Sequence, residues 1–194
     1  MSEVLAGPRI RRWTRVEYDR LVDLGFFEHG EHLDLLDGLL VVREPQGSRR
    51  AAGIRRVLAA LRRVLGDAWQ IDSQLPIVLD EATELEPDVA VVPHDPGHYR
   101  DAHPARAALI VEVADSSCRI DREYKMNLYA RAGVAECWIV DLAHETLEIH
   151  RRPEASPDSR YGWHYERVET LRAGHSVTPL VGSAGPILVA DLLP

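Results

Sequence analysis

Apolar residues recur at helical spacing in two long stretches of the chain. Across residues 48–65 the apolar positions repeat every three or four residues and Gly66 follows, which predicts an amphipathic helix. A second helix is predicted from about residue 119 to 132, where Gly133 ends it. Thr14 and Glu17 have the spacing of a capping box, so we expect a short helix from residue 14 to about 24.

Runs rich in apolar and β-branched residues predict strands around these helices. The dipeptide Asp37-Gly38 indicates the turn of a hairpin that joins residues 32–36 to residues 39–43. The remaining strands are expected at residues 69–79, 87–92, 107–114, 136–141 and 146–151. Residues 152–160 are expected to form a loop, and residues 161–194 to form short strands and turns.

The order of these elements predicts the fold class. Helix, three strands, helix, strand is the central order, with an N-terminal helix and hairpin before it and a β extension after it. One α/β domain over residues 1–194 accounts for this pattern.

Two carboxylates interrupt strands that are otherwise apolar on both faces. Asp88 lies in the run 87–92 and Glu112 in the run 108–114, and such runs are typical of covered, central strands. An unpaired carboxylate there costs several kcal/mol, so each needs a partner. If the two strands are neighbours, the carboxylates converge and favour a cation, and a hard oxygen pair suits Mg²⁺.

Lys125 follows Glu112 by thirteen residues and lies on the next predicted helix. Its ammonium could hold an attacking water and offset charge developing on a phosphate. The residues alone leave a structural alternative open. Asp88 then caps a turn, Glu112 pairs with a buried arginine, and Lys125 pairs with Asp121 one helical turn away.

Composition and charge limit the class of protein. The chain has 194 residues, 45% of them hydrophobic, and no apolar run approaches the roughly 20 residues that cross a bilayer. Two cysteines are too few for a disulfide scaffold or a zinc cluster, and the N-terminus has no signal-peptide core, so we expect a cytoplasmic protein with no membrane contact. A net charge of −8 argues against nucleic-acid binding over the whole surface.

The basic residues are almost all arginine. Lys125 is the only lysine among 23 basic residues, so its identity is a candidate functional feature. Arg49, Arg56 and Arg63 repeat every seven residues and form one stripe on the long helix. The stripe could follow a phosphate backbone, but a solvated face is slightly favoured because the total charge is negative.

Several segments together resemble the Uma-type family of restriction endonucleases, within the PD-(D/E)XK nuclease-like superfamily. The segments that carry the likeness are residues 33–38 (LDLLDG), 86–92 (EPDVAVV), 111–113 with Ser117, 121–125 (DREYK) and 128–141 (LYARAGVAECWIVD). The resemblance covers residues 14 to 193, and residues 125–141 are its most specific part.

The resemblance implies a restriction-endonuclease-like core with a mixed sheet, and metal-dependent hydrolysis of phosphodiesters. It makes Asp88 and Glu112 catalytic metal ligands, with the backbone carbonyl of Val113 as a further ligand. The motif lysine two residues after the motif acid is replaced by Ala114, and Lys125 on the following helix is its equivalent. Asp34 stands where the family usually has glutamate and is an additional acid beside the metal.

Two segments depart from the family pattern. Residues 115–118 are Asp-Ser-Ser-Cys where members often have Ser-Pro-Ser-Thr, and Arg49-Arg50 replaces a histidine near the start of the long helix.

The prediction from sequence is therefore an endonuclease that hydrolyses DNA with Mg²⁺ or Mn²⁺ and acts as a homodimer. The rival is a non-catalytic, oligomeric binding protein that retains the nuclease fold.

Overall fold

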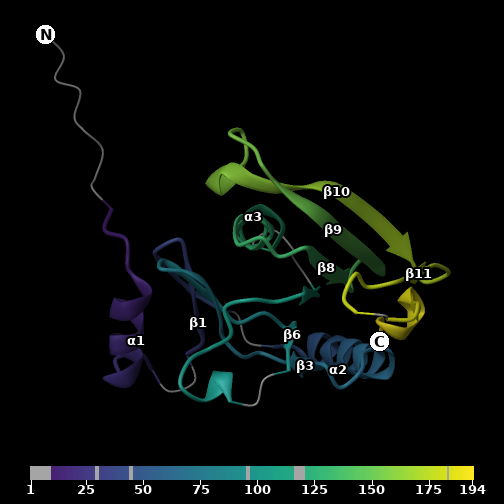
Figure 1. Ribbon diagram of the computed structural model, residues 1–194, viewed down its shortest axis with the longest axis horizontal. Helices are drawn as coiled ribbons and strands as arrows, with labels where there is room; N and C mark the ends of the chain where they lie inside the picture. The colour runs from purple at the N-terminus through teal and green to yellow at the C-terminus, as the bar shows by residue number, and fades with distance from the viewer. Residues whose placement is uncertain (1–9, 29–30, 44–45, 95–96, 116–120, 183) are drawn as a thin grey trace, which may run out of the picture.

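A six-stranded mixed sheet forms the centre of the computed structural model (Figure 1). The structure describes residues 10–28, 31–43, 46–94, 97–115, 121–182 and 184–194. In spatial order the strands are β10 (Trp163–Arg172), β9 (Thr146–Ala155), β8 (Glu136–Asp141), β7 (Leu109–Ala114), β6 (Val89–Pro93) and β3 (Trp69–Asp72). β7 and β8 are parallel and every other neighbouring pair is antiparallel.

Helices pack on both faces of this sheet. α2 (Ser48–Val64) covers one face with Ile54, Val57 and Leu61, in a core shared with the C-terminal segment. α3 (Met126–Arg131) covers the other face with Met126 and Leu128. Along the chain, α2, β3, β6, β7, α3 and β8 follow the predicted order of helix, three strands, helix and strand, so the fold prediction is confirmed.

A second sheet of four strands packs beside α3. Its spatial order is β2 (Leu39–Val42), β1 (Leu33–Leu36), β5 (Thr83–Leu85) and β4 (Ile77–Asp80). The predicted turn between β1 and β2 has positive φ at Asp37 (47°) and Gly38 (82°), the conformation that a two-residue hairpin requires. α1 (Arg15–Asp23), with the predicted capping box at Thr14, packs on the outer face of this sheet.

The structure corrects the predicted strand at residues 69–79. That segment is two strands in different sheets, β3 and β4, because the chain turns through Gln74 (φ 54°) and Pro76 has no N–H for a sheet ladder. β5, which pairs with β4, was not predicted from the sequence.

Two further boundaries differ from the predictions. The second helix starts, among the described residues, with a π-helical turn, η2 (Asp121–Lys125), before α3 continues as α-helix. The predicted loop 152–160 and short C-terminal strands are in part a long ribbon, since β9 and β10 pair from residue 146 to residue 172. No helix in the described part of the chain is long and apolar enough to cross a membrane.

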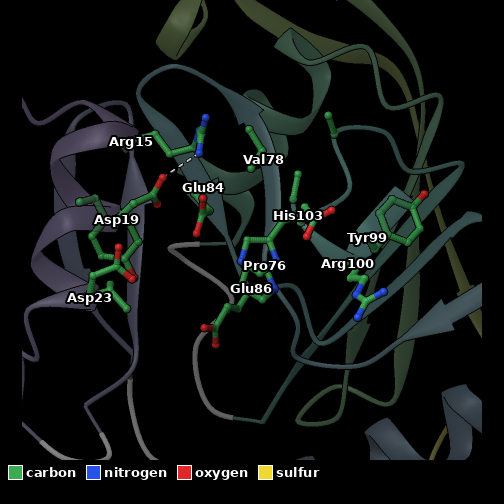
Figure 2. A pocket seen from close by; sticks show the side chains of 15 residues that line it. Arg15, Asp19, Asp23, Pro76, Val78, Glu84, Glu86, Tyr99, Arg100 and His103 are labelled. Carbon is green, nitrogen blue, oxygen red and sulfur yellow. Dashed lines mark hydrogen bonds and ion pairs between the residues drawn. The ribbon is translucent and has the colours of Figure 1, made fainter. Parts of the chain in front are cut away.

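One buried acid in the smaller sheet lacks the partners that burial normally requires. Glu84 in β5 lies opposite Leu35 of β1 and Val78 of β4, with 7% of its surface exposed, and its Oε2 atom has no hydrogen-bond partner. Burial and the negative charges of Asp19 and Glu86 raise its pKa to about 7, although Arg15 acts in the opposite direction. Figure 2 shows Glu84 between α1 and β4.

This environment predicts a pH-dependent stability effect for Glu84→Gln. The folded-state pKa of about 7 lies above the ordinary value of 4.5, so ionisation of Glu84 costs stability as the pH rises through this interval. Glutamine does not ionise, and we expect the variant to gain about 1–3 kcal/mol over the unmodified protein between pH 5 and pH 8.5. Urea unfolding at several pH values measures this. Glu81→Gln, at an exposed position of the same hairpin, is the control, and a gain that does not change with pH would contradict the prediction.

Candidate active site

The strand order brings the two predicted carboxylates to the same region of the large sheet. Glu112 lies in β7, and Asp88 comes immediately before β6, which pairs with β7 through Val89 and Val111. The backbone N–H of Val113 donates to Asp88 Oδ2 at 2.8 Å. Both carboxylates are completely buried, so each depends on protein partners for its charge.

Lys125 and Tyr129 hold the Glu112 carboxylate. Lys125 Nζ lies 3.2 Å from Glu112 Oε1 and 3.3 Å from Oδ2 of Asp34, and its side chain is 5% exposed. Tyr129, one turn further along the helix, donates its hydroxyl to the same Glu112 oxygen at 2.7 Å. Burial and the nearby Glu112 charge raise the pKa of Tyr129 well above its ordinary value, so it remains a donor at neutral pH. Asp34 comes from β1, so this contact joins the two sheets.

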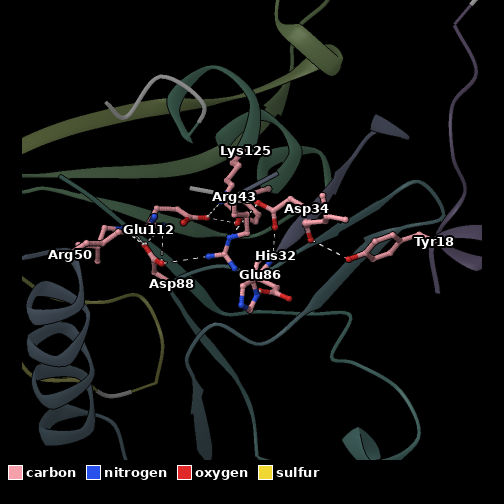
Figure 3. Close-up of polar contacts among 12 residues, drawn as sticks. Tyr18, His32, Asp34, Arg43, Arg50, Glu86, Asp88, Glu112 and Lys125 are labelled. Carbon is pink, nitrogen blue, oxygen red and sulfur yellow. Dashed lines mark hydrogen bonds and ion pairs between the residues drawn. The ribbon is translucent and has the colours of Figure 1, made fainter. Parts of the chain in front are cut away.

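Two arginines hold the Asp88 carboxylate. Arg50, in the first turn of α2, places Nη2 3.0 Å from both Asp88 oxygens. Arg43, which follows β2, lies with Nη2 3.8 Å from Asp88 Oδ1 and donates Nη1 to Glu86 at 2.5 Å. Its Nε lies 3.9 Å from Asp34 Oδ2. Figure 3 shows Arg43 between Asp88 and Asp34.

These residues form one charge-balanced group. We call Asp34, Glu86, Asp88 and Glu112 the carboxylate cluster. Three basic side chains, Arg43, Arg50 and Lys125, contact it. Burial opposes the charge of Arg43, but all four carboxylates outweigh that effect and raise its pKa. Four carboxylates and three cationic side chains thus lie within contact distance of one another at this point.

The carboxylate oxygens of the cluster are the type of ligand atom that a hard divalent cation prefers. Asp88 and Glu112 supply carboxylates, and Mg²⁺ in proteins is commonly bound by one or two carboxylates together with substrate phosphates. Val113, whose carbonyl is the further predicted ligand, contacts Asp88 through its backbone N–H. Among the described residues, no three His, Cys, Asp or Glu side chains already have the spacing of a metal site. A metal ion would have to compete with Arg50 for Asp88 and with Lys125 for Glu112.

The arginine stripe leads away from this cluster along α2. Arg49 lies near the N-terminus of α2 and contacts Asp115 at 3.1 Å and the Leu142 carbonyl at 2.7 Å. Arg63 pairs with Asp191 at 2.5 Å near the other end of the helix. Arg56 is exposed between them.

Two alternatives raised by the sequence have a structural outcome. One alternative paired Lys125 with Asp121. In the structure Lys125 pairs with Glu112 and Asp34 in the interior. The side chain of Asp121 is outside the described part of the chain, and so are Ser117 and Cys118. The other alternative expected a buried arginine beside Glu112 and a turn-capping role for Asp88. In the structure Asp88 pairs with the arginines Arg50 and Arg43, and Glu112 contacts Lys125 and Tyr129.

Sequence reasoning missed four residues that touch the cluster: Arg43, Arg50, Glu86 and Tyr129. Arg50 was noted only as a departure from the family pattern, and Glu86 and Tyr129 stood inside the family-like segments without a role. Tyr129 had a usable signal, because its position four residues after Lys125 places both on one helix face. No sequence pattern pointed to Arg43, since its partners come from other segments of the chain.

Comparisons with known proteins show the family and the fold of this chain. A solved structure described as "a putative nuclease belonging to DUF820 from Anabaena variabilis ATCC 29413" superposes with a TM-score of 0.67 at 14% identity, covering 93% of this chain and 97% of that one. That similarity shows that the fold is restriction-endonuclease-like. A search of curated proteins found no match. The family model Uma2, described as "Putative restriction endonuclease", matches residues 15–185, and the chain therefore belongs to the Uma2 family of nucleases.

Proposed function

We propose that this protein is a metal-dependent endonuclease that hydrolyses phosphodiester bonds in DNA. The observation that carries the proposal is the meeting of Asp88, Glu112 and Lys125 in one buried cluster, in a chain of a nuclease family. Buried carboxylates cost stability unless they have a role or a full set of partners. Mg²⁺ or Mn²⁺ is the cofactor that their oxygen chemistry favours.

Each residue of the cluster has a role in this proposal. Asp88, Glu112 and the Val113 carbonyl would hold the metal, which when bound polarises a phosphate oxygen and acidifies a water. Lys125 orients the attacking water and offsets negative charge on the phosphate. Asp34 and Glu112 fix the Lys125 ammonium from two sheets, and Tyr129 fixes the Glu112 carboxylate. Arg50 and Arg43 neutralise Asp88 until a metal and substrate take their place.

Substituting the two acids tests the proposed metal ligands. Glu112→Gln and Asp88→Asn keep the side-chain shape and remove the charge. Loss of a hydrogen-bond partner of a ligand alone costs about 10–100-fold in metal affinity or activity, so we expect at least about 100-fold slower nicking of plasmid DNA for these variants. Mn²⁺ titration calorimetry should show loss of metal uptake as well. Asp67→Asn, at an exposed aspartate beyond α2, is the matched control.

Lys125→Arg separates catalysis from metal binding in the same assay. A guanidinium is larger, planar and permanently charged, so it displaces or misplaces the water while it retains the positive charge. We expect cleavage to be lost and Mn²⁺ uptake to be kept.

Lys125→Ala removes the positive charge that lies between Asp34 and Glu112. Breaking a buried ion pair costs about 3–5 kcal/mol of stability, so thermal melting must accompany this variant. Full activity of Lys125→Arg would contradict the catalytic role. Absence of both cleavage and metal uptake in the unmodified protein would favour the non-catalytic, oligomeric binding protein.

The exposed arginines of α2 are the proposed DNA-backbone surface. α2 begins at the carboxylate cluster through Arg50 and contains no acidic residue. Its exposed face carries Arg55, Arg56 and Arg62, together with Arg49 and Arg63, which pair with acids in the absence of DNA. A basic helix face that starts at the site can follow phosphates outward from it.

The triple variant Arg55→Gln/Arg56→Gln/Arg62→Gln tests this surface. Each phosphate contact adds about 0.9 to the slope of log affinity against log salt, so the variant should lower that slope by about 2–3. Fluorescence anisotropy with duplex DNA at several salt concentrations measures it. The same substitutions at Arg152, Arg167 and Arg172, which are exposed on β9 and β10, are the control of equal charge. Equal slopes for both triple variants would show that α2 does not bind the backbone.

We also propose that the protein is a homodimer, since cutting two strands favours two active sites. Exposed apolar side chains on and after α1 and in the C-terminal segment support this: Val16, Val22, Leu24, Phe26, Leu180 and Leu188. Light scattering should give twice the 21.8 kDa chain mass at micromolar concentration. Phe26→Ser with Leu24→Ser should shift that mass toward the monomer, and a monomeric unmodified protein would contradict the proposal.

A further inference from the structure

A large cavity lies between the small sheet and α1, and Glu86 of the carboxylate cluster is one of its lining residues. Its volume is about 730 Å³, within the range of about 300–1,000 Å³ that is typical of small-molecule sites. α1, β4, β5 and residues 99–105 line it, as Figure 2 shows. Glu84 and Glu86 project from the strand side, Arg15 and Asp19 from α1, and Arg100 and His103 from the loop.

Glu84 is the unusual group of this cavity. Its side chain is more than nine-tenths buried, it lines the cavity, and its Oε2 atom accepts no hydrogen bond. A buried acceptor without a donor costs about 1–3 kcal/mol, so such groups are rare in folded proteins. Its sheet neighbours Leu35 and Val78 are apolar, and an apolar residue would satisfy the packing at position 84 equally well. The carboxyl therefore needs an explanation other than packing.

The charges around Glu84 favour a positive ligand. Five carboxylates line the cavity against two arginines. Arg15 is engaged by Asp19 at 2.8 Å, and Asp19 opposes ionisation of Glu84 more strongly than Arg15 supports it. Glu86 is engaged by Arg43 at 2.5 Å on the side of the carboxylate cluster. The field at Glu84 is thus negative, which repels anions and attracts cations.

We propose that this cavity binds a small organic cation with N–H donors, of the guanidinium or alkylammonium class, and that Glu84 receives it. A guanidinium presents two parallel N–H donors that match both oxygens of a carboxylate. It would donate to the Glu84 carboxylate from the cavity and neutralise the negative field. The site is separate from the proposed nuclease chemistry, and its test requires neither metal nor DNA.

Calorimetric titration of the full chain with agmatine at pH 8 tests the site. We expect one agmatine per chain, with at least tenfold weaker binding to Glu84→Gln and unchanged binding to Glu81→Gln. Tetramethylammonium has the charge without N–H donors and should bind at least tenfold more weakly than agmatine. Glu84→Gln is expected to remain folded, which thermal melting verifies, so weaker binding would report on the site and not on unfolding.

The pH dependence gives an independent readout. Because a proton on Glu84 competes with the cation, agmatine affinity should fall at least fivefold from pH 8 to pH 5.5, and this dependence should be lost in Glu84→Gln. No agmatine binding, or binding that Glu84→Gln leaves unchanged, would overturn the proposal. A blocked Gly-Arg-Gly peptide that binds more tightly than agmatine would overturn the small-ligand assignment and identify an arginine side chain of a partner protein as the occupant.

Discussion

The burial of three carboxylates, Asp34, Asp88 and Glu112, between the two sheets is the constraint on which the rest of the structure depends. Asp88 and Glu112 are fully buried, and charges in such a position are tolerated only when paired. Their partners come from three separate segments: Arg43 after β2, Arg50 in α2, and Lys125 and Tyr129 in the continuous helix η2–α3. Because each segment must reach the same point, the cluster fixes the small sheet and both helices relative to the central sheet.

The same pairing shapes what the proposed site could do. Three basic side chains contact the cluster. In the proposed function a metal would compete with Arg50 for Asp88, so its binding would require movement of a side chain in the first turn of α2. The start of the exposed arginine face lies on that same helix. Binding of a phosphate backbone and release of Asp88 could thus be linked through one element.

Glu84 and Glu112 show how different two buried glutamates can be. Glu112 accepts from Tyr129 and lies against Lys125, whereas Glu84 has an oxygen without a donor and a pKa raised to about 7. Glu112 has donors because helix η2–α3 returns to its strand. Glu84 lines a cavity between α1, the small sheet and residues 99–105. Both glutamates interrupt apolar surroundings, yet the contacts within the fold explain only Glu112.

The sequence by itself determined the elements that depend on interactions between residues close in the chain. The capping box at Thr14, the hairpin turn at Asp37-Gly38 and the amphipathic helix of residues 48–64 all form as predicted, because each depends on neighbours within a few residues. The carboxylates in apolar strands also marked the candidate site, since burial of a charge requires a partner wherever that partner lies. The division of residues 69–79 between two sheets and the pairing of β5 depend on contacts across the chain, which no periodicity encodes. Arg50 and Asp88 are 38 residues apart, and Arg43 and Glu86 are 43 apart, so only the tertiary structure decided which cation meets which acid.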